Sequence, residues 1–181
     1  MSHEEDLQKI KQAASGDRLA MRDLIDQHKR GVYSLAYNML ARAEDAEDVT
    51  QEAFLRAWKV FPKWRPDAKL STWLHKVALN LCYDQLRKKR PVLFAEPPES
   101  QDPALQPDRS LAEQQTQIAV RAAIAELPPR QRAALTLTSL QGHSNKATAD
   151  IMNIKVAALE SLLARARRNL KTQLLPLKET L

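Results

Sequence analysis

Hydrophobic residues recur every three or four positions through most of the chain, which is the spacing of helices that bury one face. The clearest stripe lies in a helix expected from Asp17, as its cap, to about Arg42, and consists of Met21, Leu24, Ile25, His28, Val32, Leu35 and Met39. Gly31 lies inside this helix and weakens it. A shorter helix over residues 3–14 precedes it and ends near Ser15 and Gly16. No stretch alternates like a strand for more than a few residues, so the pattern predicts an all-α protein.

Two further helices are predicted around an aromatic, basic loop. The first runs from Asp45 to Phe61, with an inner face of Val49, Ala53, Phe54, Ala57, Trp58 and Phe61. Pro62 and Pro66 interrupt the helical pattern. The second begins with Ser71 or Thr72 as its cap and runs to about Lys89, with Leu74, Val77, Ala78, Leu81 and Cys82 facing inward. We expect Trp58 and Trp73 to fill the core.

A proline-rich, acidic stretch divides the chain into two small helical domains. It predicts a flexible linker over residues 91–111, between a first domain at 1–90 and a second at 112–181. The second domain is expected to open with a helix whose inner side carries Leu111, Ile118, Ala122 and Ala125. Pro128 or Pro129 then starts the next helix, and Gly142 ends it.

The end of the chain has the pattern of a helix-turn-helix. Ser144 can cap a short helix, Asn153 tolerates a tight turn, and a long helix follows from Val156 to about Leu174. The buried side of that long helix is expected to be Leu159, Leu162, Leu163, Ala166 and Leu170. In this motif the second helix enters the major groove. A plain helical hairpin in a bundle would show a similar pattern.

Charge along the chain favours a polyanionic partner. The net charge is +6 in total, and it divides into +4 over residues 1–90, −4 over 91–113 and +6 over 114–181. Two basic blocks around an acidic spacer suit nucleic acid, although ordinary solvated charge would look similar. The loop around Trp64 could stack on an unpaired base, or its tryptophans could only fill the core.

Other classes of protein are poorly supported. Cys82 is the one cysteine, so the chain forms no internal disulfide and no cysteine cluster for a metal. The four histidines have no metal-ligand spacing, and His28 on an apolar stripe suits a core position. We find no phosphate loop or nucleophile motif, so neither an enzyme nor a cofactor is expected. With no span of ~20 apolar residues and no signal peptide, we expect no membrane insertion and a cytoplasmic location.

Three segments, in order, resemble bacterial sigma factors of the extracytoplasmic-function class. Residues 45–58 resemble the segment that binds the polymerase clamp, and residues 71–80 resemble the promoter-melting helix. Residues 127–144 and 164–167 resemble the second DNA-binding domain, and the match covers roughly residues 17–90 and 112–172. The resemblance implies binding to the clamp and flap regions of core RNA polymerase, to duplex and single-stranded promoter DNA, and to an anti-sigma protein.

The resemblance also implies roles for individual residues. Core polymerase would be contacted by Asp45, Asp48, Gln51, Glu52 and Phe54. The −10 element would be contacted by Lys63, Trp64, Arg65, Asp67, Lys69, Lys76, Asn80, Tyr83, Arg87 and Lys88. The −35 element would be contacted by Arg130, Ser144, Lys155, Glu160, Ser161, Ala164, Arg165, Arg167 and Arg168. Glu160 and Leu162 stand where the family has basic residues at the start of the recognition helix. Ala147 and Thr148 also depart from the family pattern.

Two alternatives remain open from the residues alone. The chain could be a stand-alone helix-turn-helix regulator, which would have no need for an acidic surface at residues 45–58. It could also be a protein-binding adaptor, in which case it would lack salt-sensitive affinity for DNA.

Overall fold

The computed structural model describes residues 3–65, 69–88 and 111–178, with side chains for 3–65, 69–88 and 118–175. The described residues fold into helices and contain no strand, as the sequence predicts. The elements are α1 (His3–Ala14), α2 (Arg18–Leu40), α3 (Ala43–Val60), η1 (Phe61–Lys63), α4 (Leu70–Lys88), α5 (Leu111–Ala125), α6 (Pro129–Leu135), η2 (Thr136–Leu140), α7 (Asn145–Met152) and α8 (Val156–Lys178). The predicted linker lies mostly outside the described residues.

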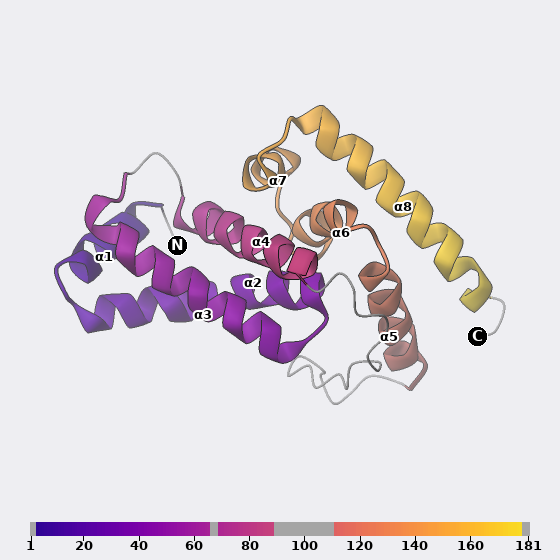
Figure 1. Ribbon diagram of the computed structural model, residues 1–181, viewed down its shortest axis with the longest axis horizontal. Coiled ribbons are helices and arrows are strands. Elements are labelled where there is room, and N and C mark those ends of the chain that lie inside the picture. Colours follow the sequence, from indigo (N-terminus) through magenta and orange to yellow (C-terminus); the bar gives the residue numbers. More distant parts are fainter. Residues whose placement is uncertain (1–2, 66–68, 89–110, 179–181) are drawn as a thin grey trace.

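Helices α1 to α4 form a first bundle, in which α2 contacts the other three (Figure 1). Val32, Leu35 and Met39 of α2 are fully buried. They pack in one core with Leu74 and Cys82 of α4. Burial of these side chains removes apolar surface from water, which is the main force that holds such a bundle together.

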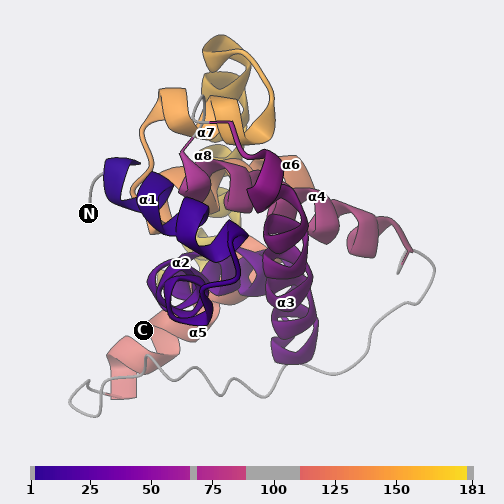
Figure 2. The same cartoon turned by 90° about the vertical axis from the view of Figure 1, so that its left-hand side faces the viewer.

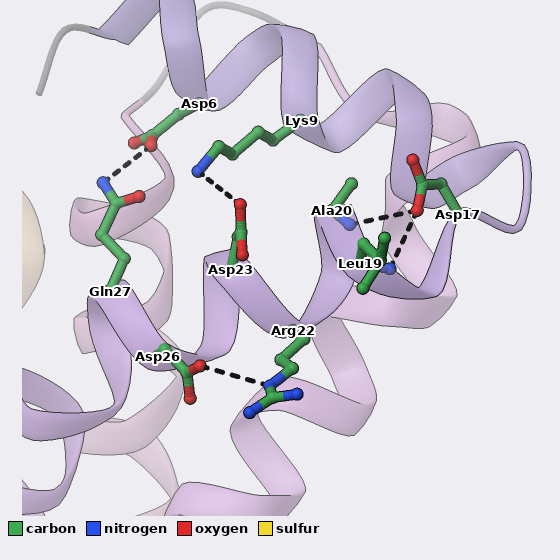
Figure 3. A network of polar contacts seen from close by, with 9 residues as sticks. All are labelled: Asp6, Lys9, Asp17, Leu19, Ala20, Arg22, Asp23, Asp26 and Gln27. Atoms are coloured by element: carbon green, nitrogen blue, oxygen red, sulfur yellow. Dashed lines mark hydrogen bonds and ion pairs between the residues drawn. The ribbon is translucent and has the colours of Figure 1, made fainter.

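Polar contacts cap α2 and join it to α1. Asp17 accepts hydrogen bonds from the backbone nitrogens of Leu19 and Ala20, at 2.8 and 3.2 Å, and so caps α2 as predicted (Figure 3). The buried Asp6 accepts a hydrogen bond of 2.9 Å from Gln27. Figure 3 also shows ion pairs between Lys9 and Asp23, at 3.1 Å, and between Arg22 and Asp26, at 3.7 Å.

Two predicted helix starts differ from the structure. α3 begins at Ala43, with Arg42 in the capping position, rather than at Asp45. α4 begins at Leu70, so Ser71 and Thr72 lie within its first turn and do not cap it. Leu70 is 1% exposed, and its burial in the core extends the helix beyond the point that capping propensity indicates.

Helices α5 to α8 form a second bundle. Ile124 and Leu127 pack with Leu135 of α6 and Ala166 of α8. The predicted inner side of α5 is therefore wrong, because Ile118 is 59% exposed and Ala122 is exposed, whereas Ala123 and Ile124 are buried. Alanines at many positions of α5 let the hydrophobic stripe be read on more than one face.

The end of α6 departs from a regular helix. Pro129 starts α6 as predicted, but residues Thr136–Leu140 form a π-helical turn, η2, in which Gln141 N donates to Thr136 O at 3.0 Å. Gly142 then adopts a φ of 71°, which a residue without Cβ accommodates readily. Wide turns of this kind occur frequently at functional positions, and this one places Gln141 and His143 against the first bundle.

The two bundles pack directly on each other. α7 lies against α4, and α6 and η2 lie against α2 (Figures 1 and 2). Ala133, Leu137 and Ile151 of the second bundle belong to the core of the first. Helix α8 lies on the far side of α6 and α7 from α4 (Figure 1). None of the described helices combines the length and apolarity required to cross a membrane.

Candidate nucleic-acid interface

The outer face of α3 carries acidic and apolar side chains that the fold does not use. Asp48, Gln51, Leu55 and Trp58 follow one another at intervals of three, four and three residues, and all four are exposed. We call them the α3 ridge. Leu55 is 57% exposed and Trp58 is 50% exposed. Neighbouring apolar groups exposed beside charges are typical of a protein-binding surface, and tryptophan is often central to one.

The remaining residues of the proposed polymerase surface lie close to the α3 ridge. Asp45 is half-buried and lies 3.7 Å from the Arg42 guanidinium. Glu52 accepts a hydrogen bond of 2.7 Å from Arg56, one helical turn further along. Each of these two acids therefore has a basic neighbour, whereas Asp48 has no ion pair among the described residues.

The sequence pattern placed both Phe54 and Trp58 on the inner face of this helix, and the resemblance also implied a polymerase contact for Phe54. Phe54 is 7% exposed and belongs to the core, so its ring does not face a partner. Trp58, expected in the core, points to solvent. The reason is helical geometry: Ala53 and Ala57 define the centre of the buried face, Phe54 flanks it on the inner side, and Trp58 lies just past its edge.

The loop after α3 holds a cluster of three aromatic rings. Trp64 packs edge-on against Phe61, with ring centroids 6.2 Å apart, and against Trp73, at 5.6 Å. Trp64 is half-buried, and its Nε1 is buried without a hydrogen-bond partner in the described part of the chain. The indole thus has a structural role in addition to any contact with a base. Trp73 is half-buried and packs against the core, where it was expected.

Basic side chains surround this aromatic cluster. Lys63, Arg65 and Lys69 are exposed. Asp67, which we also predicted to lie near the −10 element, falls outside the described residues. The geometry offers three cations next to a partly exposed aromatic surface, a combination suited to a single-stranded nucleic acid.

The predicted DNA-facing row of α4 is only partly exposed. Lys76, Asn80, Arg87 and Lys88 face solvent, and Arg87 donates to Asp84 at 2.7 Å. Tyr83 is half-buried, and its burial raises the pKa of its phenol to about 12, while the positive charge of Arg130 acts in the other direction. Tyr83 therefore packs against the core more than it faces a ligand.

α7, its turn and α8 have the geometry of a helix-turn-helix. Ser144 Oγ accepts from Ala147 N at 3.2 Å and caps α7. Asn153 adopts the left-handed conformation with a φ of 52°, and Ile154 N donates to Ala149 O at 3.0 Å, which closes the turn. Ala149 is buried at the point where α7 meets α8, and its small side chain permits the close approach.

One side of α8 is free to enter a groove. Leu159, Leu163 and Ala166 are buried against the bundle. The opposite side is exposed and contains Glu160, Ser161, Ala164, Arg165, Arg167 and Arg168, and Lys155 just before the helix is also exposed. Within the described residues the three arginines form no ion pair with an acid, so their charge is available to phosphates. Arg130 is exposed at the start of α6, where its positive charge opposes the raised pKa of Tyr83 in α4.

The structure therefore places most of the predicted residues on three surfaces, on α3, on the loop with α4, and on α8, whereas Phe54 is buried and Arg130 lies on α6. Leu55 was missed, although its position four residues after Gln51 and three before Trp58 was a readable signal. No group of three or more histidine, cysteine, aspartate or glutamate side chains among the described residues has the geometry of a metal site.

Family models match both bundles. Sigma-70 region 2 matches residues 24–92, and Sigma-70 region 4 matches residues 117–170. The chain is 37% identical over 156 residues to the ECF RNA polymerase sigma factor SigM of Mycobacterium tuberculosis, covering 86% of this chain and 78% of that protein. It is 30% identical over 177 residues to the ECF RNA polymerase sigma factor SigW of Bacillus subtilis, covering 92% and 95%.

Solved structures share the fold. CnrH, in complex with the cytosolic domain of CnrY, superimposes with a TM-score of 0.70 at 24% identity, over 94% of this chain and 97% of that one. The sigma factor RpoE of Bartonella quintana, in complex with the anti-sigma factor NepR, gives 0.69 at 23% identity, over 84% and 95%. Since both sigma-70 regions occur in order and relatives match along nearly the whole length, the chain belongs to the extracytoplasmic-function (ECF) family of RNA polymerase sigma factors.

Proposed function

We propose that the α3 ridge, with Asp45 and Glu52 beside it, is the surface through which this sigma factor binds core RNA polymerase. The observation that carries this assignment is the exposure of Leu55 and Trp58 in line with Asp48 and Gln51. Exposed tryptophan and leucine contribute little to folding, and they contribute strongly when a partner removes them from water. A stand-alone DNA-binding regulator would have no use for this surface.

The other two surfaces would then recognise the promoter. The cations around Trp64 and the exposed side of α4 would hold the melted −10 strand, and the exposed side of α8 would read the −35 element in duplex DNA. The protein would supply specificity and strand opening, while the polymerase performs the bond chemistry. Since the protein would act on RNA polymerase, we place it in the cytoplasm. We further propose an anti-sigma protein as its inhibitor, because the sigma factor RpoE of Bartonella quintana, which shares the fold, has been solved in complex with the anti-sigma factor NepR.

The polymerase surface is tested by reversing its charge. Asp48→Arg with Glu52→Arg places two cations on and beside the α3 ridge without altering a buried side chain. We expect this variant to lose co-purification with core polymerase and promoter-directed transcription in vitro while keeping its helical circular dichroism. The matched control is Glu4→Arg with Asp26→Arg, which makes the same change of charge on exposed acids of α1 and α2. Polymerase binding that survives in the first variant, or is lost equally in both, would refute the assignment.

A further inference from the structure

The contact between the two bundles, which we call the seam, contains two histidines face to edge. The rings of His75 from α4 and His143 from the segment after η2 have centroids 4.9 Å apart, at an angle of 80°. Beside them, Gln141 Nε2 donates to Gly31 O in the middle of α2 at 2.8 Å. An added Cβ at Gly31 would lie 3.4 Å from the His75 ring, so the glycine leaves the ring close against α2.

His75 is held as a neutral ring with a defined tautomer. Its Nδ1 lies 2.6 Å from Ser71 O, and since a carbonyl only accepts, the hydrogen is on Nδ1 and Nε2 is bare. His75 is 6% exposed, and the second bundle covers it through Gln141 and His143. The Gln141 Oε1 atom is buried without a hydrogen-bond partner in the described residues.

The surroundings of His75 disfavour a positive charge. Burial lowers the pKa of His75 to about 4, and neighbouring positive charge on His143 or His28 acts in the same direction, while Ser71 O and the Gln141 side chain act against it. Burial also lowers the pKa of His143. If both His75 and His143 bound a proton, two positive charges would lie side by side in a buried site.

The charged groups on the elements around the seam do not compensate for such a charge. From α2, His28 has its pKa lowered by burial, and the Asp6 carboxylate of α1, 3.5 Å away, opposes that shift. Lys146 and Asp150 of α7 are exposed. Arg132 of α6 donates to the carbonyl oxygens of residues at helix ends and not to the histidines. On α3, the charged residues are exposed or half-buried on the face away from the core.

The contact between the two bundles limits how far apart their DNA-binding surfaces can lie, and its consequence for promoter binding rests on the proposed function. Promoter elements named for positions −10 and −35 lie ~25 base pairs apart, which is about 85 Å of duplex at ~3.4 Å per base pair. Each bundle is built from helices of at most 23 residues, and such helices are about 35 Å long. Two bundles of that size in contact reach about 70 Å between their farthest points. Simultaneous binding of both elements therefore requires the seam to open.

We propose that the seam is a proton-sensitive switch: protonation of His75 and His143 separates the two bundles and releases them for binding to the two promoter elements. The sign follows from the location of the rings. Each ring binds a proton more tightly in water than in the closed seam, so the closed form is favoured above the ordinary pKa of ~6.5 and loses stability as the pH falls below it. For His75, whose pKa burial lowers to about 4, the closed form is disfavoured increasingly as the pH falls below ~6.5.

The test uses the free, full-length chain. Lys11→Cys on α1 and Lys171→Cys on α8 provide exposed sites for a donor and an acceptor dye. Cys82 is fully buried, and burial raises the pKa of its thiol to about 12, so the dyes do not label it. We expect energy transfer to be constant above pH 7 and to change by at least half of its full range between pH 6.5 and 5.0, at unchanged far-ultraviolet circular dichroism.

Matched variants connect the change to the two rings. His75→Gln with His143→Gln should give a flat profile from pH 7.5 to 5.0, because glutamine cannot take up a proton. The control His3→Gln removes a histidine far from the seam in sequence and should keep the wild-type profile. Energy transfer that does not change in the wild type, or that changes equally in the double variant, would overturn the proposal.

A second measurement covers the case in which the double variant is already open at pH 7.5. The His75 and His143 ring protons of the wild-type chain are then followed by nuclear magnetic resonance, and they should titrate together with the change in energy transfer. Titration of the rings without a change in transfer would overturn the proposal. Neither experiment includes polymerase or DNA, so its failure leaves the assignment of the α3 ridge intact, and loss of that assignment leaves this result intact.

Discussion

Arg132 offers the sharpest test of how the two bundles are held together. Its guanidinium donates to Met39 O, at 2.5 Å, and also to Ala125 O and to Leu127 O, the last at 3.1 Å. Met39 and Ala125 lie in the last turns of α2 and α5, where backbone carbonyls have no partner within the helix. Arg132 thus places a cation at the negative ends of two helices, one from each bundle.

Arg132→Met removes the charged donor and keeps a side chain of similar length. A hydrogen bond to a charged group contributes ~1.5–3 kcal/mol, and three such bonds exceed the desolvation of one half-buried guanidinium by ~3 kcal/mol. Desolvation is also the cause of the lowered pKa of Arg132, but this does not change its charge in the neutral range. We expect the free energy of unfolding to fall by about 3 kcal/mol, which corresponds to a Tm lower by ~6–12 °C for a chain of this size.

Equilibrium unfolding in urea, followed by circular dichroism at 222 nm, measures this loss. Arg130→Met is the matched control, since Arg130 is exposed two residues earlier in the same helix and should change stability by less than ~0.5 kcal/mol. Arg132→Lys should recover only part of the loss, because an ammonium group cannot reach three carbonyls in the geometry of the guanidinium fork. A loss below ~1 kcal/mol for Arg132→Met, or one equal to that of Arg130→Met, would show that this cation does not join the bundles.

Three further predictions concern the surfaces and the core. Trp64→Ala should lower the free energy of unfolding by ~2–3 kcal/mol, because its ring packs on two others. Trp58→Ala should lower it by less than ~1 kcal/mol, because this ring is exposed, yet should weaken polymerase binding. Equal losses of stability in thermal unfolding would contradict this. Arg165→Ala with Arg168→Ala should weaken duplex binding and reduce the slope of log affinity against log salt by ~2, and a slope unchanged in fluorescence anisotropy titrations would show that neither residue contacts a phosphate. Gly31→Ala should raise stability by ~1 kcal/mol, since the new Cβ meets the His75 ring at contact distance without overlap; a loss of more than ~1 kcal/mol in urea unfolding would contradict this.

Sequence was sufficient for the elements that local chemistry determines. The Asp17 and Ser144 caps, the left-handed Asn153 and the proline start of α6 all occur where the residue types indicate. Each depends on one side chain and the few backbone groups next to it, so no knowledge of the rest of the fold is needed. The helix-turn-helix at the end of the chain was predictable for the same reason.

The directions of side chains at the edges of helical faces were less predictable. Trp58 and Phe54 are both large, apolar and next to the buried alanines of α3, so hydrophobicity alone could not distinguish the exposed ring from the buried one. In α5 the alanines made the stripe ambiguous, and Ile118 was placed on the wrong side. Packing against α6 and α8 decides the matter, and this information is not local.

The seam was beyond prediction because each of its parts is unremarkable where it occurs in the sequence. Gly31 reads as a weak point of a helix, His75 and His143 as scattered histidines, and Gln141 as a polar residue before a glycine. Their effect arises only when the π-helical turn η2 displaces Gln141 and His143 toward α2 and α4, more than sixty residues away along the chain. Because this placement brings His75 and His143 together, the free energy of closing the seam depends on the charge of both rings. A sigma factor of this family could therefore keep its helices, its DNA-reading side chains and its α3 ridge, and lose the response to protons by changing the two histidines of the seam.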